Sequence, residues 1–220
     1  MAREINLLKA RFLWYHLNLS QFSAMFGLHA IQGGIKLAKN ILIINGATRK
    51  NGNTDIIINK IIEGSINEKV KINLIKLRSK KISDCIGCYT CYEKNKCSIN
   101  DDMKEILDSI NRSDMIIFAS PIYWWGVTGI MKIFIDRLYF YYSSRNKNLI
   151  SGKKALVIAP MNMKQDNYKT KIFIEFFNIL FDNLELVKIN IFFFDNISEK
   201  GEILNNPDYI EQAYTIGRNL

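Results

Sequence analysis

The sequence predicts an α/β fold, a doubly wound five-stranded parallel sheet with helices on both faces. Five short apolar runs alternate with segments of helical periodicity, and strands buried on both faces of a parallel sheet are expected to be continuously apolar. The 220 residues are also enough to bury a substantial core. We place this domain at residues 40–220, after an N-terminal extension of residues 1–39.

Most of the predicted strands end at a residue that interrupts a strand. Gly46 follows the first apolar run, and Pro121 and Pro160 stop two later ones. The second run differs because its apolar and polar residues alternate, as they do in a half-buried strand. The predicted strands are 40–45, 70–77, 115–119, 154–159 and 186–194.

Helical periodicity separates these strands. Asp102 and Glu105 have the spacing of a capping box, and Asn206 with Pro207 is typical of an N-cap followed by a first-turn proline. We therefore predict helices at 54–63, 102–111, 128–142 and 168–181, and a final helix that begins at residue 207.

Three loops are expected to carry the chemistry of this fold. In open parallel sheets, ligands bind where loops leave the carboxyl ends of the strands, at the point where the strand order reverses. In this sequence those loops are 45–54, 119–127 and 160–167.

The loop of residues 45–54 joins a strand to a helix N-terminus, where free backbone N–H groups and the helix dipole attract a phosphate. Arg49 can add a charge-assisted contact, and Thr48, Asn53 and Thr54 can add neutral hydrogen bonds. The loop matches neither the Walker pattern nor G-x-G-x-x-G. A polar turn with a satisfied N-cap is the alternative, but glycine, arginine and hydroxyls at one helix start favour phosphate binding.

The loop Ser120–Gly126 places Tyr123, Trp124 and Trp125 directly after a buried strand. Aromatic side chains and a glycine at this position suit a flat ring, which could stack on the side chains and bond the backbone. The alternative is that the aromatic residues only cover the sheet edge. Two adjacent tryptophans at a ligand-facing strand end favour a binding site.

All four cysteines lie within one short run, Cys85, Cys88, Cys91 and Cys97. This C-x2-C-x2-C-x5-C spacing can wrap one metal centre, and iron–sulfur clusters are held by compact runs of this kind. Four thiolates also satisfy zinc, and free reduced thiols are a third possibility. A disulfide framework is not expected in a chain of this size without a secretory signal.

Composition limits the classes of function. The formal charge is +9, but the basic residues are scattered and no nucleic-acid-binding module is recognisable, so we predict no nucleic-acid partner. No apolar run approaches the ~20 residues that cross a bilayer, and we expect a cytoplasmic protein without a membrane span. Residues 1–39 carry five basic residues and one acidic residue; they could form an amphipathic docking helix, but we favour a non-essential extension.

Together the loops resemble a known family. Residues 45–54 are similar to the N-G-S-P-R-K-x-G-N-T phosphate loop of the flavodoxin-like, NAD(P)H-dependent FMN reductase family. Residues 120–126 and 131–137 resemble its S-P-[VI]-Y-W-G…K-x-F-x-D-R segment. The cysteine run, with residues 101–103 after it, resembles the iron–sulfur flavoprotein branch. The resemblance covers residues 40–220 and does not extend to the N-terminal extension.

The resemblance implies a flavodoxin-like fold and an FMN site. The residues implied to hold the FMN phosphate are Thr48, Arg49, Asn53 and Thr54. Those implied to line the isoalloxazine ring are Pro121, Ile122, Tyr123, Trp124 and Gly126. It also implies a 4Fe–4S cluster, whose candidate ligands in the cysteine loop 85–97 are Cys85, Cys88, Cys91 and Cys97.

The sequence departs from the family pattern at some positions. Ala47 stands where the family usually has a phosphate-binding serine, and Thr48 replaces a proline and could restore the missing hydroxyl. The loop 161–166 differs from the usual small-residue loop. Asp136 and Arg137 are expected to lock their helix in place rather than to touch substrate.

We therefore predict an FMN-dependent redox protein that passes electrons between a reduced donor, FMN and a 4Fe–4S cluster. The donor would be NAD(P)H or a ferredoxin-like protein, and a homo-oligomer would bring cluster and flavin together. No catalytic side chain is predicted, because the chemistry lies on FMN. Two alternatives remain: an NAD(P)H:quinone or flavin reductase without a cluster, and a non-catalytic flavin-binding module that acts through residues 1–39.

Overall fold

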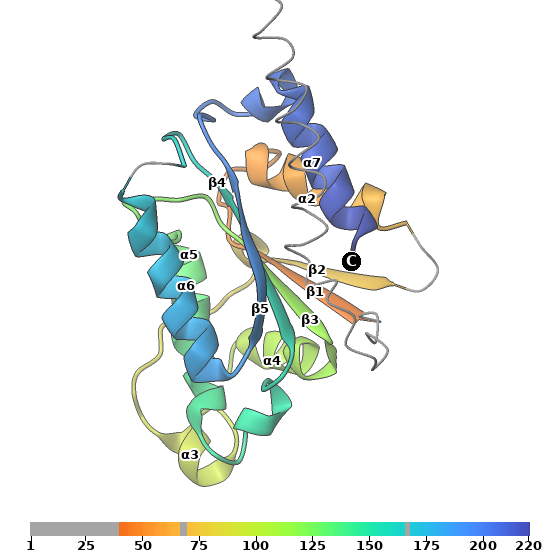
Figure 1. The fold of residues 1–220 in the computed structure, drawn as a ribbon. Helices are drawn as coiled ribbons and strands as arrows, with labels where there is room; N and C mark the ends of the chain where they lie inside the picture. Colours follow the sequence, from red (N-terminus) through yellow and green to blue (C-terminus); the bar gives the residue numbers. More distant parts are fainter. Residues whose placement is uncertain (1–39, 67–69, 166–167) are drawn as a thin grey trace, which may run out of the picture. The chain divides into compact units, whose positions relative to one another are not determined.

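The computed structural model describes residues 40–66, 70–165 and 168–220, and it confirms the predicted fold class. Five parallel strands form one sheet in the order β2-β1-β3-β4-β5 (Figure 1). The strands are β1 Asn40–Asn45, β2 Lys71–Lys76, β3 Met115–Ala119, β4 Lys154–Pro160 and β5 Val187–Phe194. The predicted N-terminal extension lies outside the described residues.

Helices cover both faces of the sheet (Figure 1). Helices α2 and α7 pack together on one face, and α4, α5 and α6 lie on the other. The helices are α2 Asn53–Gly64, α3 Thr90–Lys94, α4 Met103–Arg112, α5 Gly129–Arg137, α6 Thr170–Leu184 and α7 Pro207–Arg218. Short 3₁₀ helices are η1 Leu77–Ser79, η2 Leu138–Tyr142, η3 Lys147–Leu149 and η4 Glu202–Asn205. No helix of these described segments is both long and apolar enough to span a bilayer.

The burial of each strand follows its place in the sheet. All residues of β3 are buried, as expected for a strand with a neighbour on each side and helices on both faces. The edge strand β2 alternates between exposed and more buried positions, which explains its alternating sequence. On the α4–α6 face, Phe118 of β3 packs against Phe177 and Phe181 of α6 at ring-centroid distances of 5.8 and 5.4 Å.

The segment predicted to be helical over 128–142 is helical, but it contains two kinds of helix. The helix predicted over 128–142 is α-helical only to Arg137 and continues as the 3₁₀ helix η2. With three residues per turn, η2 points both Leu138 and Tyr141 into the core, where each is almost fully buried. The Tyr141 hydroxyl donates a hydrogen bond to Asn111 Oδ1 at 2.8 Å.

The predicted capping box at the start of α4 is not formed. Asp102 is the N-cap residue, but its carboxylate accepts from the Lys81 backbone N–H at 2.7 Å instead of capping the helix. The preceding residue, Asp101, accepts from the Met103 N–H at 3.1 Å. Tertiary contacts to the segment around Lys81 therefore take the carboxylate that a local pattern would assign to the helix.

Helices α2 and α7 approach each other where each has a glycine. A Cβ on Gly217 would lie 2.0 Å from the Ile61 carbonyl oxygen, and one on Gly64 would lie 2.0 Å from the Tyr214 carbonyl oxygen. Backbone, not a flexible side chain, fills the space at both positions. The close approach fixes the position of α2, whose N-terminus faces the cavity described below.

We expect Gly217→Ala to lower the free energy of unfolding by about 3 kcal/mol, because the new methyl group must push two helix backbones apart. Urea denaturation followed by far-UV circular dichroism measures the change. Gly129→Ala is the matched control, since nothing lies within 4 Å of a Cβ at Gly129, and it should change stability by less than about 1 kcal/mol. Equal losses in both variants would contradict the assigned contact.

Candidate functional site

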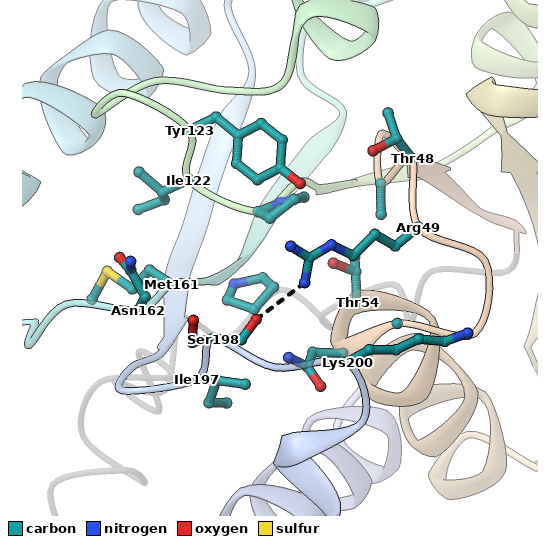
Figure 2. Close-up of a pocket in the computed structure, with 15 residues that line it drawn as sticks. Thr48, Arg49, Thr54, Ile122, Tyr123, Met161, Asn162, Ile197, Ser198 and Lys200 are labelled. Carbon is teal, nitrogen blue, oxygen red and sulfur yellow. Dashed lines mark hydrogen bonds between the residues drawn. The ribbon is translucent and has the colours of Figure 1, made fainter.

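A cavity lies at the carboxyl ends of β1, β3 and β4, where the predicted loops meet (Figure 2). The predicted site residues that line it are Thr48, Arg49, Asn53, Thr54, Pro121, Ile122 and Tyr123. Trp124 and Gly126 are not among its lining residues. Sequence reasoning missed the segment after β5, which contributes Ile197, Ser198 and Lys200. Proximity of that segment depends on the chain path after β5, for which the sequence gives no local signal.

The loop after β1 is held in shape by one buried carboxylate, Asp55. Its Oδ1 accepts from the Asn45 side-chain amide at 2.6 Å, and its Oδ2 accepts from the Asn51 backbone N–H at 2.7 Å. Arg78, which follows β2, donates to both oxygens at 3.0 and 2.8 Å and also to the Ala47 carbonyl at 3.2 Å. Asp55 and Arg78 together therefore hold both the beginning of this loop, at Asn45 and Ala47, and its later part at Asn51.

The environment of Asp55 favours its charged form. Burial of the side chain opposes ionisation, but hydrogen bonds from Arg78, the Asn51 backbone and the Asn45 amide outweigh that effect. The pKa of Asp55 consequently lies below its ordinary value of 3.8. A charged Asp55 pairs with Arg78 and keeps the first turn of α2 in place.

The N-terminus of α2 faces the cavity without a side-chain cap. Gly52 is the N-cap residue and has no side chain that could accept a hydrogen bond from the first turn. The first N–H groups of a helix have no partner within the helix and carry the positive end of its dipole. Thr54, in this first turn, is buried and lines the cavity. The cavity therefore offers an anion both donors and a favourable potential.

Arg49 and Asn53 also contact the segment after β5. Arg49 Nη1 donates to the Ser198 carbonyl at 3.1 Å, a bond drawn in Figure 2. The Asn53 side-chain amide donates to the Glu199 carbonyl at 2.8 Å and accepts from the Ile203 N–H at 3.4 Å. Asn53 can still offer its backbone N–H to a ligand, while Arg49 keeps further donors on its guanidinium group.

The aromatic loop after β3 is a tight turn. Tyr123 and Gly126 exchange backbone hydrogen bonds of 2.9 and 3.0 Å, and Trp124 and Trp125 between them have positive φ angles of 47° and 59°. Two consecutive positive φ values define the type I′ turn that usually contains Asn or Gly, and the left-handed conformation costs other residues about 1–2 kcal/mol each. The turn points Trp124 outward, 87% exposed, while Tyr123 lines the cavity.

This turn and the loop after β1 are joined at the start of α5. The Thr128 side chain caps α5 by accepting from the Met131 N–H at 3.3 Å, and its hydroxyl donates to the Gly46 carbonyl at 2.7 Å. The Thr128 N–H donates to Ser120 Oγ at 3.1 Å. The two ligand-facing loops are thus fixed relative to each other by buried hydrogen bonds.

The four cysteines lie in the segment between η1 and α4, which includes the short helix α3. None of them lines this cavity, and none is paired in a disulfide. Hydrogen bonds with Ser98 and Thr90 lower the pKa of the exposed Cys88 thiol to about 7. Burial raises the pKa of Cys91, and the neighbouring Cys97 and Cys85 raise it further. Cys88 Sγ forms a hydrogen bond with Ser98 Oγ at 3.0 Å. Within the described ranges, no group of Cys, His, Asp or Glu side chains is gathered closely enough to form a ready metal site.

Arg137, at the end of α5, holds the base of the cysteine loop. Its guanidinium group pairs with Asp101 at 2.7 and 3.1 Å, and it donates to the Ser83 carbonyl at 2.7 Å and to Cys97 Sγ at 3.3 Å. Arg137 is 4% exposed. The neighbouring Asp136 instead pairs with Lys132 on the exposed face of α5. Only Arg137 of these two residues therefore reaches another part of the chain.

Comparison with known proteins identifies close relatives of this chain. Residues 39–173 match the family described as NADPH-dependent FMN reductase. A Bacillus subtilis protein, whose name describes an NAD(P)H-dependent FMN-containing oxidoreductase, is 32% identical over 172 residues, which is 74% of this chain and 83% of that protein. An iron–sulfur flavoprotein of Clostridioides difficile is 45% identical over 103 residues, 45% of each chain.

Solved structures share the fold of this chain. The solved structure of an NAD(P)H:quinone oxidoreductase from Methanothermobacter marburgensis matches with a TM-score of 0.64 and 15% identity, over 83% of this chain and 98% of that one. At this identity the likeness establishes the fold alone. The chain spans about half the length of the curated iron–sulfur flavoproteins it matches first.

We expect Asp55→Ala to lower the free energy of unfolding at pH 7 by about 3 kcal/mol, since it leaves Arg78 without its partner. The native pKa of Asp55 is depressed, so its contribution is present above the unfolded value near 3.8 and is lost as the pH falls through the native pKa. The difference between wild type and variant, measured by urea denaturation, should therefore shrink below pH 4.

Glu63→Ala is the control for this prediction. Glu63 forms an exposed ion pair with Lys60 on the same helix, and its loss should cost less than about 1 kcal/mol. A pH-independent difference for Asp55→Ala would show that the ionised carboxylate does not stabilise the loop.

Proposed function

Because the chain belongs to the NADPH-dependent FMN reductase family, we propose that it is an FMN-dependent NAD(P)H oxidoreductase of the iron–sulfur flavoprotein type. The observation that carries the proposal is the uncapped N-terminus of α2, which faces a cavity whose other wall is the aromatic loop. FMN has a phosphate group, which would lie at the helix N-terminus, and a flat isoalloxazine ring, which would lie against the aromatic loop. The residues present therefore fit this cofactor.

The phosphate would be held by groups of the loop after β1. They are the free N–H groups of the first turn of α2, the hydroxyls of Thr48 and Thr54, and the guanidinium group of Arg49. Thr48 would supply the hydroxyl contact that Ala47 lacks. Asn53 would contribute its backbone N–H, because its amide is engaged with the segment after β5.

The ring system would lie against the loop after β3. Pro121, Ile122 and Tyr123 line the cavity there. The strained turn at Trp124 and Trp125, closed by backbone bonds between Tyr123 and Gly126, fixes the backbone at Tyr123. Met161 and Asn162, after β4, complete this side of the cavity. FMN, when bound, supplies the hydride and single-electron chemistry, and these residues orient it and shield it from water.

Cys85, Cys88, Cys91 and Cys97 are proposed as ligands of a 4Fe–4S cluster. The donor set has the right number of ligands and the right chemistry. The names of several relatives support the same cofactor. Cys88 would have to leave Ser98 to join the others. A homo-oligomer, a cytoplasmic location and a nicotinamide or ferredoxin-like electron donor remain part of this proposal.

The lack of a ready metal site in the described segments favours one second candidate, an NAD(P)H:quinone or flavin reductase whose cysteines bind no metal. Purification without oxygen, followed by an absorption spectrum and assays of iron and acid-labile sulfide, separates the two. We expect flavin bands together with about four iron and four sulfide ions per chain. Cys91→Ser should lose the iron and keep the flavin. Flavin without iron or sulfide in the wild type would establish the second candidate.

Arg49 provides a test of the FMN site itself. If its guanidinium group pairs with the phosphate, Arg49→Ala should weaken FMN binding by roughly 10- to 100-fold, the value of one charge-assisted hydrogen bond, and leave riboflavin binding nearly unchanged. Flavin fluorescence quenching measures both affinities. Lys50→Ala is the control, because Lys50 is in the same loop but does not line the cavity. Equal weakening for both flavins would contradict the phosphate contact.

A further inference from the structure

We propose that Arg137 is a positioning residue that raises the reduction potential of the sulfur-bound iron site through its hydrogen bond to Cys97. This inference rests on the proposed cluster and adds a residue outside the cysteine run. Arg137 belongs to α5, a helix that begins beside the cavity and ends beneath the cysteine loop. Among the arginines in the described residues, Arg137 is the one whose guanidinium group donates a hydrogen bond to a cysteine sulfur.

The geometry leaves this guanidinium group little freedom. Nη1 donates to the Ser83 carbonyl and to Asp101 Oδ2, both at 2.7 Å, while Nη2 donates to Asp101 Oδ1 at 3.1 Å and to Cys97 Sγ at 3.3 Å. The partners come from both ends of the loop that carries the cysteines. Arg137 therefore ties Cys97 to α5, while Cys85 and Cys88 are exposed.

Burial makes the interaction electrostatically strong. The side chain of Arg137 is 2% exposed and that of Asp101 is 9% exposed, so water screens neither charge well. Asp101 neutralises most of the charge on Arg137, but the Nη2–H bond still points at the sulfur. The electrostatic potential at Cys97 Sγ therefore depends on the positive charge of Arg137 and on how far Asp101 offsets that charge.

Such a donor should favour the reduced state of an iron site bound through Cys97. Reduction adds one electron and makes the ligating sulfur more negative, and hydrogen bonds to the sulfurs are among the factors that set the potential of iron–sulfur proteins. Loss of the donor should lower the potential. Loss of the carboxylate that neutralises the donor should raise it.

These opposite signs define the experiment. Protein reconstituted with iron and sulfide under anaerobic conditions is titrated with dithionite, which donates one electron per cluster, and the midpoint potential is read from the visible spectrum. We expect a lower potential than wild type for Arg137→Gln and a higher one for Asp101→Asn. Lys132→Met removes a cation from the exposed face of the same helix and should leave the potential unchanged.

The outcomes separate electrostatics from a merely structural role. Loosening of the loop would shift both variants in the same direction or reduce iron and sulfide content in both, and either result would overturn the proposal. If Arg137→Gln does not fold, Arg137→Lys replaces it. This variant keeps the positive charge but loses the planar set of donors, and its potential should fall by less. Asp101→Asn must still show the higher potential. An unchanged potential in Asp101→Asn would also overturn it.

The same preparation tests the proposed function separately. A wild-type protein that takes up FMN but no iron would overturn both the cluster and the role of Arg137. A wild-type protein with normal iron and sulfide content, and variants with unshifted potentials, would overturn the role of Arg137 alone. The flavin potential, measured in the same titration, serves as an internal reference that none of the three substitutions should move.

Discussion

Asp55 joins the parts of the chain that together form the ligand cavity. One carboxylate contacts the end of β1, the loop that follows it and Arg78 beyond β2, and it does so from the first turn of α2. Burying a charge of this kind is unfavourable unless it is fully paired, and here the partners come from the end of β1, from the loop after it and from η1. The loop can therefore leave the helix N-terminus uncapped, because its shape does not depend on a capping side chain.

Helix α5 connects the cavity with the segment that carries the cysteines. Its first residues share buried hydrogen bonds with both ligand-facing loops through Thr128, and its last residue, Arg137, contacts Cys97. A helix is a stiff element with all of its interior backbone bonds satisfied, so it fixes the distance between the groups at its ends. The cysteine loop has little regular structure of its own, and its position relative to the cavity follows from this helix.

The sequence predicted the strands, their parallel arrangement and the loops that meet at the cavity, because apolar runs and glycine or proline breaks report directly on local structure. It also assigned Thr48, Arg49 and Tyr123 to the cavity, where they lie. It could not show that Asn53 would bond the segment after β5, or that Arg137 would reach Cys97 forty positions earlier. Both contacts join residues far apart in sequence, and neither has a local pattern. The capping box at Asp102 failed for the same reason.

The bonds from Arg49 and Asn53 also join the segment after β5 to the loop that lines the other side of the cavity. The Ser198 carbonyl uses a donor of the guanidinium group that an anion in the cavity would share. If a bound anion strengthens or weakens the bond between Arg49 and Ser198, that bond changes the affinity for the anion by the same free energy, because such coupling is reciprocal. A ligand held by the loop after β1 would therefore also change the contacts of the stretch between β5 and α7, where Ser198 lies 149 positions after Arg49.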